Sequence, residues 1–178
     1  MSEQGTRPTT RYMKSYFKGA PVIGAEIGVF KGINALRMLK ILDMAPLHCI
    51  DSWITPECMK GELDYNALYF ETVKRLKERS DVEIHRATSH DIASKFKREY
   101  FDFVYIDGDH GYEGCKQDIE DYYPLVKKGG ILCGHDFRCE GVRKAVTQFS
   151  KKHNLTVLDT RAIGEHDRRP YGEWLIKV

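Results

Sequence analysis

The chain has 178 residues, 42% hydrophobic and 30% charged, a composition typical of a single globular domain. Its formal charge of +2 is nearly neutral and its basic residues are scattered, which disfavours nucleic acid as a partner. The N-terminal stretch is polar, and no apolar run is long enough to span a bilayer. The five cysteines form no CxxC pair. We therefore expect a cytoplasmic protein without a membrane span.

Short apolar runs of strand length alternate with longer segments of helical period. The predicted strands are 22–27, 47–50, 82–87, 101–106, 130–133, 155–158 and 173–178, and the predicted helices are 33–44, 64–79, 90–96, 112–126 and 141–153. This alternation predicts an α/β fold: a single Rossmann-like domain of three layers with a mostly parallel seven-stranded sheet. The last two strands are expected to form an antiparallel C-terminal hairpin. Residues 1–21 are assigned to an N-terminal arm or helix, and 22–178 to the domain.

Two boundaries carry sequence signals of their own. Pro46 is expected to keep the helix at 33–44 from continuing into the second strand, because proline lacks the N–H that a helix interior needs. Lys127-Lys128 followed by Gly129-Gly130 is typical of a helix end, with cations at the negative end of the dipole and glycine after it. These signals predict that the helix at 112–126 ends next to the two glycines.

A glycine turn follows the first strand. Gly28 and Gly32 allow a tight turn and a close ligand, and Glu26 supplies a negative group just before it. A dinucleotide turn needs G-x-G-x-x-G, whereas Phe30 occupies its second glycine position, which weakens a nicotinamide-cofactor hypothesis. An ordinary strand–helix turn without a ligand is the alternative.

Asp51 ends the second strand, at the place where an acid can accept both hydroxyls of a ribose. A helix cap or a solvated loop acid is the structural alternative. Since every nucleoside-binding hypothesis predicts this acid, Asp51 does not distinguish among them.

The ends of the fourth and fifth strands carry the densest set of reactive groups. Five side chains are expected to converge there: Asp107, Asp109, His110, His135 and Asp136. Clustered acids repel one another and shift each other's pKa, which folding alone does not require and which a bound cation would relieve. The alternative for single members, such as Asp109 or Asp136, is a helix cap or an ion pair with a basic neighbour.

These motifs together resemble the class I S-adenosylmethionine-dependent methyltransferases. The resemblance rests on Glu26-x-Gly28-x-x-x-Gly32, Asp51, Ser89-His90-Asp91, Ile106-Asp107-Gly108-Asp109-His110-x-Tyr112-Glu113, Gly129-Gly130 and Gly134-His135-Asp136. It extends from about residue 22 to the C-terminus. The most similar branch is the small metal-dependent O-methyltransferases that include the macrolide-sugar enzymes, with catechol O-methyltransferase more distant.

The resemblance implies S-adenosylmethionine as the cofactor and assigns six residues to it. They are Glu26 near the methionine ammonium, Gly28 and Gly32 around the methionine portion, Asp51 on the ribose, and Ser89 with His90 at the adenine.

The resemblance also implies a catalytic centre. Asp107, His135 and Asp136 match the ligands of a divalent metal, and His110 matches a general base, so Asp107 and His110 are the predicted catalytic residues. The imidazole of His135 suits a transition metal better than magnesium, which leaves the ion open between the two. The implied reaction is O-methylation of a small-molecule or sugar hydroxyl.

Two other functions stay open at the level of sequence. Asp107-Gly108-Asp109 also resembles the metal-binding DxD of nucleotide-sugar glycosyltransferases, which would leave the glycine turn unexplained. A non-catalytic nucleoside-binding domain would not need the acids and histidines. The expected partner is a small-molecule substrate, a homodimer is left open, and the N-terminal arm and segment 52–65 are candidate covers of the acceptor pocket.

Overall fold

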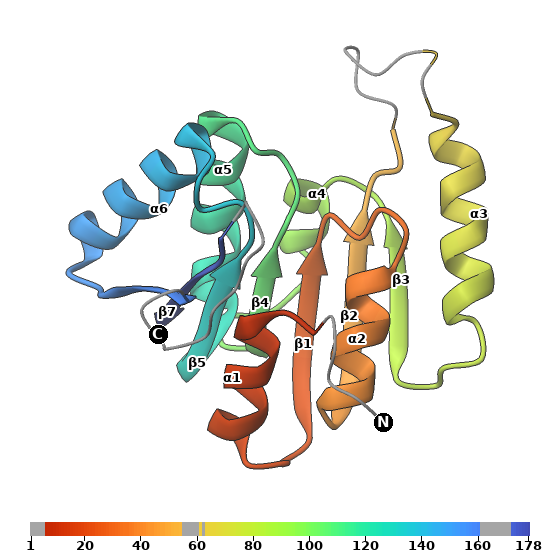
Figure 1. Ribbon diagram of the computed structural model, residues 1–178, viewed down its shortest axis with the longest axis horizontal. Helices are drawn as coiled ribbons and strands as arrows, with labels where there is room; N and C mark the ends of the chain where they lie inside the picture. The colour runs from red at the N-terminus through yellow and green to blue at the C-terminus, as the bar shows by residue number, and fades with distance from the viewer. Residues whose placement is uncertain (1–5, 55–60, 62, 161–171) are drawn as a thin grey trace.

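A seven-stranded sheet forms the middle layer of the protein (Figure 1). The structure is a computed structural model in which residues 6–54, 61, 63–160 and 172–178 are described. In spatial order the strands are β3 (Val82–Arg86), β2 (Met44–Asp51), β1 (Val22–Ile27), β4 (Phe101–Ile106), β5 (Val126–Gly134), β7 (Trp174–Lys177) and β6 (Val157–Asp159). The first five are parallel, and β7 is antiparallel to both β5 and β6. The predicted mostly parallel sheet with its antiparallel C-terminal pair is confirmed.

Helices cover both faces of the sheet (Figure 1). One layer is formed by α1 (Pro8–Phe17), α2 (Ile33–Ile41) and α3 (Tyr65–Leu76), and the other by α4 (Ser89–Ala93), α5 (Tyr112–Tyr122) and α6 (Glu140–His153). Among the described residues, none of the helices has both the length and the apolar character that crossing a membrane requires.

The central strand β4 is apolar along its whole length because it is buried on both faces. Phe103 and Tyr105 pack with the layer that contains α2, whereas Val104 and Ile106 pack with the layer that contains α5. A continuous apolar run of this kind is typical of a parallel strand in a three-layer sheet, and it explains why the sequence predicted these bounds correctly.

Two predicted helix ends are wrong. The first long helix ends at Ile41, since Leu42 is already extended, and Pro46 lies inside β2 rather than in the preceding turn. The helix predicted to reach residue 126 ends at Tyr122 and is followed by the short 3₁₀ helix η2 (Tyr123–Leu125), where Pro124 cannot supply a helical N–H. The Lys-Lys-Gly-Gly run lies within β5, so it marks an irregular strand and not a helix end.

The turn after β1 is held against the end of β4. The N–H of Gly28 donates to the carbonyl of Ile50, and the N–H of Asp107 donates to the carbonyl of Ile27. Gly28 has a φ of +83°, and a Cβ added to it would lie 2.1 Å from the carbonyl oxygen of Asp107. Gly28 is therefore required by the packing of two backbones, before any ligand is considered.

Replacing Gly28 by alanine should destabilise the protein by about 3 kcal/mol or more, because a positive φ and a backbone clash are combined. Gly19→Ala is the matched control: Gly19 has a φ of +75° but nothing within 4 Å of the added Cβ, so it should cost only about 1–2 kcal/mol. Equilibrium unfolding in denaturant measures both. Equal losses in the two variants would contradict the proposed clash.

Candidate functional site

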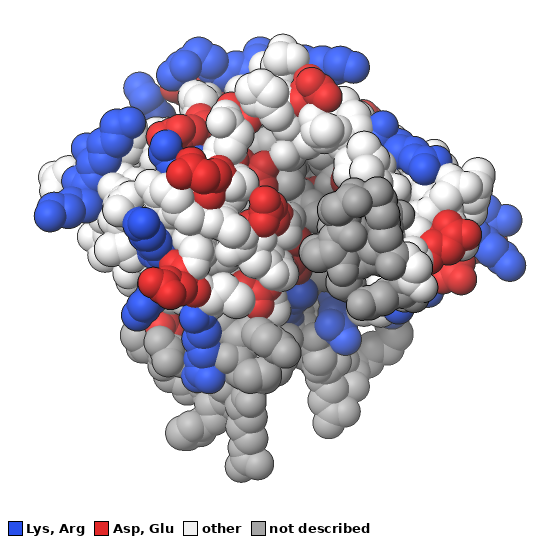
Figure 2. Space-filling model, turned by 90° about the horizontal axis from the view of Figure 1, so that it is seen from above, with Lys and Arg blue, Asp and Glu red and all other residues white. Residues whose placement is uncertain are grey.

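The predicted site residues lie along the edge where the parallel strands end. Ile27 pairs with Ile50 of β2 and with Ile106 of β4, and Ile106 pairs with Gly134 of β5, so these strands end at one level. Figure 2 looks onto this edge and shows Asp and Glu side chains toward the middle of the face, with Lys and Arg side chains mainly around its rim. In sheets of this kind, ligands bind at the carboxyl ends of the strands.

Glu26 is a buried acid next to the glycine turn. Asn34 Nδ2 donates a hydrogen bond of 2.8 Å to Glu26 Oε1, while Glu26 Oε2 and Asn34 Oδ1 are buried and have no hydrogen-bond partner among the described residues. Burial raises the pKa of Glu26 to about 8. A buried carboxylate oxygen that is not hydrogen-bonded to any described residue fits the ammonium group of a ligand, since a positive partner would favour the charged carboxylate.

Asp51 connects the two loops that follow β1 and β2. Its Oδ2 accepts from the N–H of Phe30 at 2.8 Å, and its Oδ1 accepts from the N–H of Trp53 at 2.7 Å. Both donors have a positive φ, 51° for Phe30 and 45° for Trp53. A carboxylate offers about four acceptor positions, so Asp51 keeps capacity for ligand hydroxyls in addition to this structural role, which the sequence did not reveal.

Ser89 and His90 begin α4, and their side chains bond to residues of α5. Ser89 Oγ donates to Asp118 Oδ1 at 2.5 Å, and His90 Nδ1 lies 2.8 Å from Asp121 Oδ2. Burial raises the pKa of Asp118 to about 6, and the hydrogen bond to Asp121 raises the pKa of the exposed His90. The predicted place of Ser89 and His90 at an adenine stays a prediction.

Four of the five residues at the ends of β4 and β5 come together. Asp136 Oδ2 lies 3.0 Å from both His110 Nε2 and His135 Nδ1. Asp107 Oδ1 lies 3.6 Å from His135 Nδ1 and 3.8 Å from His110 Nε2. One ligand atom from each of Asp107, His110 and Asp136 lies within 4.8 Å of the others, a spacing that a metal ion could bridge.

The charges in this cluster shift the pKa of its members in opposite directions. The pKa of His110 is raised, chiefly by its interaction with Asp107 and further by the charge of Asp136. For Asp136, burial acts to raise the pKa, but the hydrogen bond from His135 and the nearby cations outweigh it and lower the pKa. His110 is half exposed while Asp136 is buried, so the imidazole is the member that a substrate could reach.

Asp109 does not join the cluster, contrary to the expected convergence. Its Oδ1 accepts from the N–H of Gly111 at 2.7 Å, and its carboxylate lies against Gly114 in the first turn of α5. Asp109 therefore forms a local turn before α5, because a bond to the backbone N–H two residues further on competes with a longer reach across the sheet edge. A DxD metal site would need Asp109 beside Asp107.

Arg7 is a site residue that the sequence analysis missed. Its Nη1 donates to Asp107 Oδ2 at 2.8 Å and also to the hydroxyl of Tyr105. Tyr105 in turn donates to Glu173 Oε1 at 2.5 Å, and Glu173 is almost fully buried at the start of β7. Arg7 of the N-terminal arm thus contacts the cluster through Asp107, whereas a cover over the acceptor pocket stays a prediction. No sequence signal identified Arg7 or its buried partners.

Glu173 also anchors α1 to the sheet. The N–H and the hydroxyl of Thr9 donate to Glu173 Oε2 at 2.9 and 3.0 Å. The acid thus meets unpaired N–H groups at the start of a helix, where a negative charge is favoured. This anchor places Arg7, which directly precedes the helix, over Asp107.

Segment 52–65, the second candidate cover, lies partly outside the described residues. Trp53 is buried and its Nε1 donates to the carbonyl of Phe30 at 2.9 Å, whereas Ile54 and Phe30 are exposed apolar side chains. The ring of Phe30 lies 6.1 Å from that of Tyr65 at the start of α3. The described part of this segment therefore carries apolar surface next to the glycine turn.

Comparisons with known proteins agree with this arrangement. A family model described as a methyltransferase domain matches residues 25–137. Among curated protein sequences, none matches the chain.

Solved structures show the same fold at low identity. A putative caffeoyl-CoA O-methyltransferase from Staphylococcus aureus is 17% identical, with 97% of this chain and 84% of that chain covered and a TM-score of 0.67. An O-methyltransferase from Bacillus cereus in complex with SAH is 14% identical, covering 100% and 84%, with a TM-score of 0.66. A putative methyltransferase from Streptococcus mutans in complex with SAH is 14% identical, covering 97% and 98%, with a TM-score of 0.64.

The family match spans more than half of the chain, and the described residues have the sheet order and helix layers set out above. The protein therefore belongs to the methyltransferase domain family and is a class I S-adenosylmethionine-dependent methyltransferase.

Proposed function

We propose that this enzyme methylates a hydroxyl group of a small molecule, with His110 removing the proton of that hydroxyl. The observation that carries the proposal is the contact of 3.0 Å between His110 Nε2 and the buried carboxylate of Asp136, on a ring whose side chain is 51% exposed. An imidazole held by an acid on one side and open on the other is suited to act as a general base.

The residues around the glycine turn fit the cofactor. S-adenosylmethionine, when bound, supplies a methyl group activated on a sulfonium. Glu26 would receive the ammonium, because its Oε2 is buried and without a partner, and Asp51 would accept the ribose hydroxyls on its remaining acceptor positions. The backbone at Gly28 and Gly32 would lie along the methionine portion, and Ser89 with His90 would border the adenine.

Asp136 orients the base. If the Nε2 hydrogen of His110 is donated to Asp136 Oδ2, Nδ1 is the ring atom that accepts a proton, and the buried acid stabilises the imidazolium that results. The acceptor hydroxyl would bind within reach of His110 Nδ1. The exposed apolar side chains of Phe30 and Ile54 suit a partly apolar acceptor.

A divalent metal fits the same edge. Asp107 Oδ1, His135 Nδ1 and Asp136 Oδ2 would hold it, with Arg7 paired to the other oxygen of Asp107. A cation there lowers the pKa of a hydroxyl that binds to it. With His135 as the imidazole ligand, His110 stays available to take the proton, and the nitrogen donor favours a transition metal over magnesium.

The acceptor is proposed to be a small molecule. Two of the solved proteins of the same fold are named O-methyltransferases, the putative enzyme from S. aureus and the enzyme from B. cereus. The near-neutral charge of the chain disfavours nucleic acid as the acceptor. The glycosyltransferase alternative is not favoured, because the Asp109 carboxylate bonds to the Gly111 N–H and does not join Asp107 in the cluster.

Glu26→Gln should weaken S-adenosylmethionine binding about tenfold or more in calorimetry, while making the ligand-free protein more stable at high pH. A carboxyl whose pKa is about 8 in the fold and about 4.5 in the unfolded chain destabilises folding increasingly as pH rises between these values. The stability difference between variant and wild type should therefore grow from pH 5 to pH 8.

Glu78→Gln, at an exposed position, is the control and should change neither quantity. Unchanged cofactor affinity in Glu26→Gln would remove Glu26 from the binding site, whereas a pH-independent stability difference would contradict its buried, neutral state.

His110→Ala should lower turnover by roughly 10²- to 10⁴-fold, the range that general-base catalysis supplies, and leave cofactor affinity nearly unchanged. His153→Ala, an exposed histidine at the end of α6, is the matched control and should keep full turnover. Steady-state rates with a verified acceptor and calorimetry with S-adenosylmethionine make the comparison. Wild-type turnover in His110→Ala would exclude the proposed base.

Removal of divalent metal by a chelator should reduce turnover, and added Mn²⁺ or Co²⁺ should restore it. Asp136→Asn should lose the response to metal; asparagine suits the φ of +55° at this position, so the fold should be kept. Full turnover in the chelated wild type would contradict metal assistance but leave His110 as the base.

A further inference from the structure

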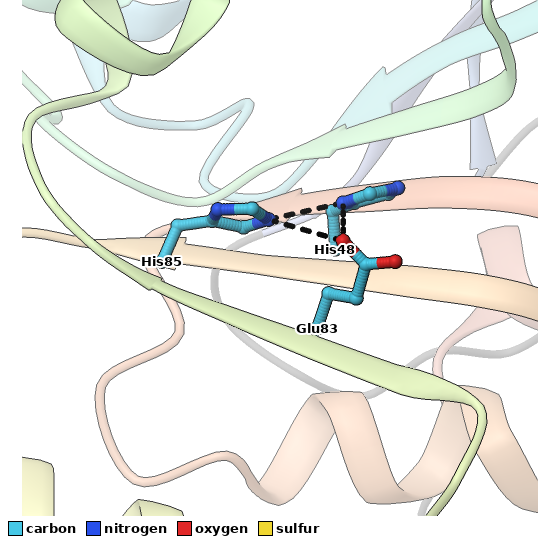
Figure 3. A group of neighbouring side chains, drawn as sticks. All are labelled: His48, Glu83 and His85. Atoms are coloured by element: carbon cyan, nitrogen blue, oxygen red, sulfur yellow. Dashed lines mark hydrogen bonds and ion pairs between the residues drawn. The ribbon is translucent and has the colours of Figure 1, made fainter.

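Three polar side chains face one another on the sheet away from the methyl-transfer edge (Figure 3). His48 lies on β2, and Glu83 and His85 lie on the neighbouring edge strand β3. Glu83 is the direct cross-strand partner of His48, and His85, two residues later, points to the same face. His48 precedes Asp51 by three residues, roughly 10 Å along the strand at about 3.3 Å per residue.

We propose that His48 Nδ1, His85 Nε2 and Glu83 Oε2 bind one divalent transition-metal ion of the zinc type, which fastens the edge strand β3 to β2. Two imidazoles and one carboxylate are a donor set that zinc takes readily and magnesium does not. The site is separate from the cluster of Asp107 and Asp136 and is not needed for the function proposed above.

The distances between the three ligand atoms match one metal ion. Nδ1 of His48 lies 3.0 Å from Nε2 of His85 and 3.4 Å from Oε2 of Glu83, and the last two atoms are 4.0 Å apart. Donors bound at about 2.0–2.2 Å with near-tetrahedral angles are separated by roughly 3.3–3.5 Å. Only shifts of a few tenths of an ångström are needed, and Figure 3 shows the three groups directed at one another.

The surroundings hold the His48 ring in place. It is almost fully buried and makes edge contacts with Phe96, Tyr100 and Phe101, with ring centroids 4.9–5.7 Å apart. Its second nitrogen, Nε2, lies 3.5 Å from the Tyr100 hydroxyl. Metal-binding histidines commonly have a partner of this kind on the other ring nitrogen, which fixes the orientation of the ring.

The other two ligands lie toward solvent, which gives an ion a path of entry. The side chain of His85 is 23% exposed and that of Glu83 is 56% exposed, so water can complete the coordination. Burial lowers the pKa of both histidines, that of His48 to about 4, so the rings are neutral and have a lone pair for a metal near pH 7. Lys95 is a nearby cation that acts on His85, and Glu83 offsets its charge.

Without an ion, the cluster would be only a pair of hydrogen-bonded imidazoles. That arrangement explains the contact between His48 and His85, but it does not require the Glu83 carboxylate beside both rings on an open edge strand. The two cases differ in one measurable property: only the metal site gains stability in proportion to the free-ion concentration.

The test uses the untagged full chain freed of metal by chelation and titrated with Zn²⁺ in a calorimeter and in thermal unfolding. Co²⁺ serves as a visible-absorption probe of the same ligands. The wild type should bind Zn²⁺ at this site and unfold at a higher temperature when it is bound. His85→Gln should lose this binding, and Glu83→Gln should weaken it about 10- to 100-fold.

Both substituted side chains are at least partly exposed, so the variants should fold. Asp136→Asn removes one proposed ligand at the methyl-transfer edge and should keep the binding at His48, Glu83 and His85, as should His153→Gln, the control for surface histidines. The proposal is overturned if the wild type binds no Zn²⁺, or if His85→Gln retains the affinity, the stabilisation and the Co²⁺ absorption that Asp136→Asn shows.

Discussion

The contact between the ends of β1 and β4 is the constraint on which the site depends. The Gly28 backbone lies so near the Asp107 carbonyl that a Cβ would come within 2.1 Å of it. This approach fixes the level at which β4 ends and therefore the position of Asp107 and His110 beyond it. A larger residue in the turn would push the strand ends apart and separate the glycine turn from the acid cluster.

The charge balance at the carboxyl edge of the sheet depends on Arg7, which precedes the first helix. Asp107 and the buried Asp136 and Glu173 lie near one another, and carboxylates gathered in this way need positive partners. Arg7 supplies one, because Glu173 accepts hydrogen bonds from Thr9 and so anchors the start of α1. The N-terminal helix is thus part of the electrostatics of the site as well as of its packing.

Periodicity was sufficient to predict the strands and the edge on which Asp51, Asp107 and His135 lie, because buried parallel strands are continuous apolar runs whose ends meet. The contact of Arg7 could not be predicted, since it depends on how α1 docks after the sheet has formed. Asp109 was misplaced because a local bond to the Gly111 N–H competes with convergence at the sheet edge. The helix ends were misplaced because Pro46 lies inside a strand and Pro124 in a 3₁₀ helix. Hydrophobic periodicity does not distinguish these positions from the turn that follows a helix.

Strand β2 links the two polar centres of the molecule. Asp51 at its end accepts from the N–H groups of the neighbouring loops, and the carbonyl of Asp51 accepts from the N–H of Ala87, just after β3. The register of the edge strand therefore sets where Ser89 and α4 begin. An edge strand has hydrogen-bonded neighbours on one side only, so it is the strand that the sheet holds least. An ion that joined His48 to Glu83 and His85 would hold its register, and with it the start of α4.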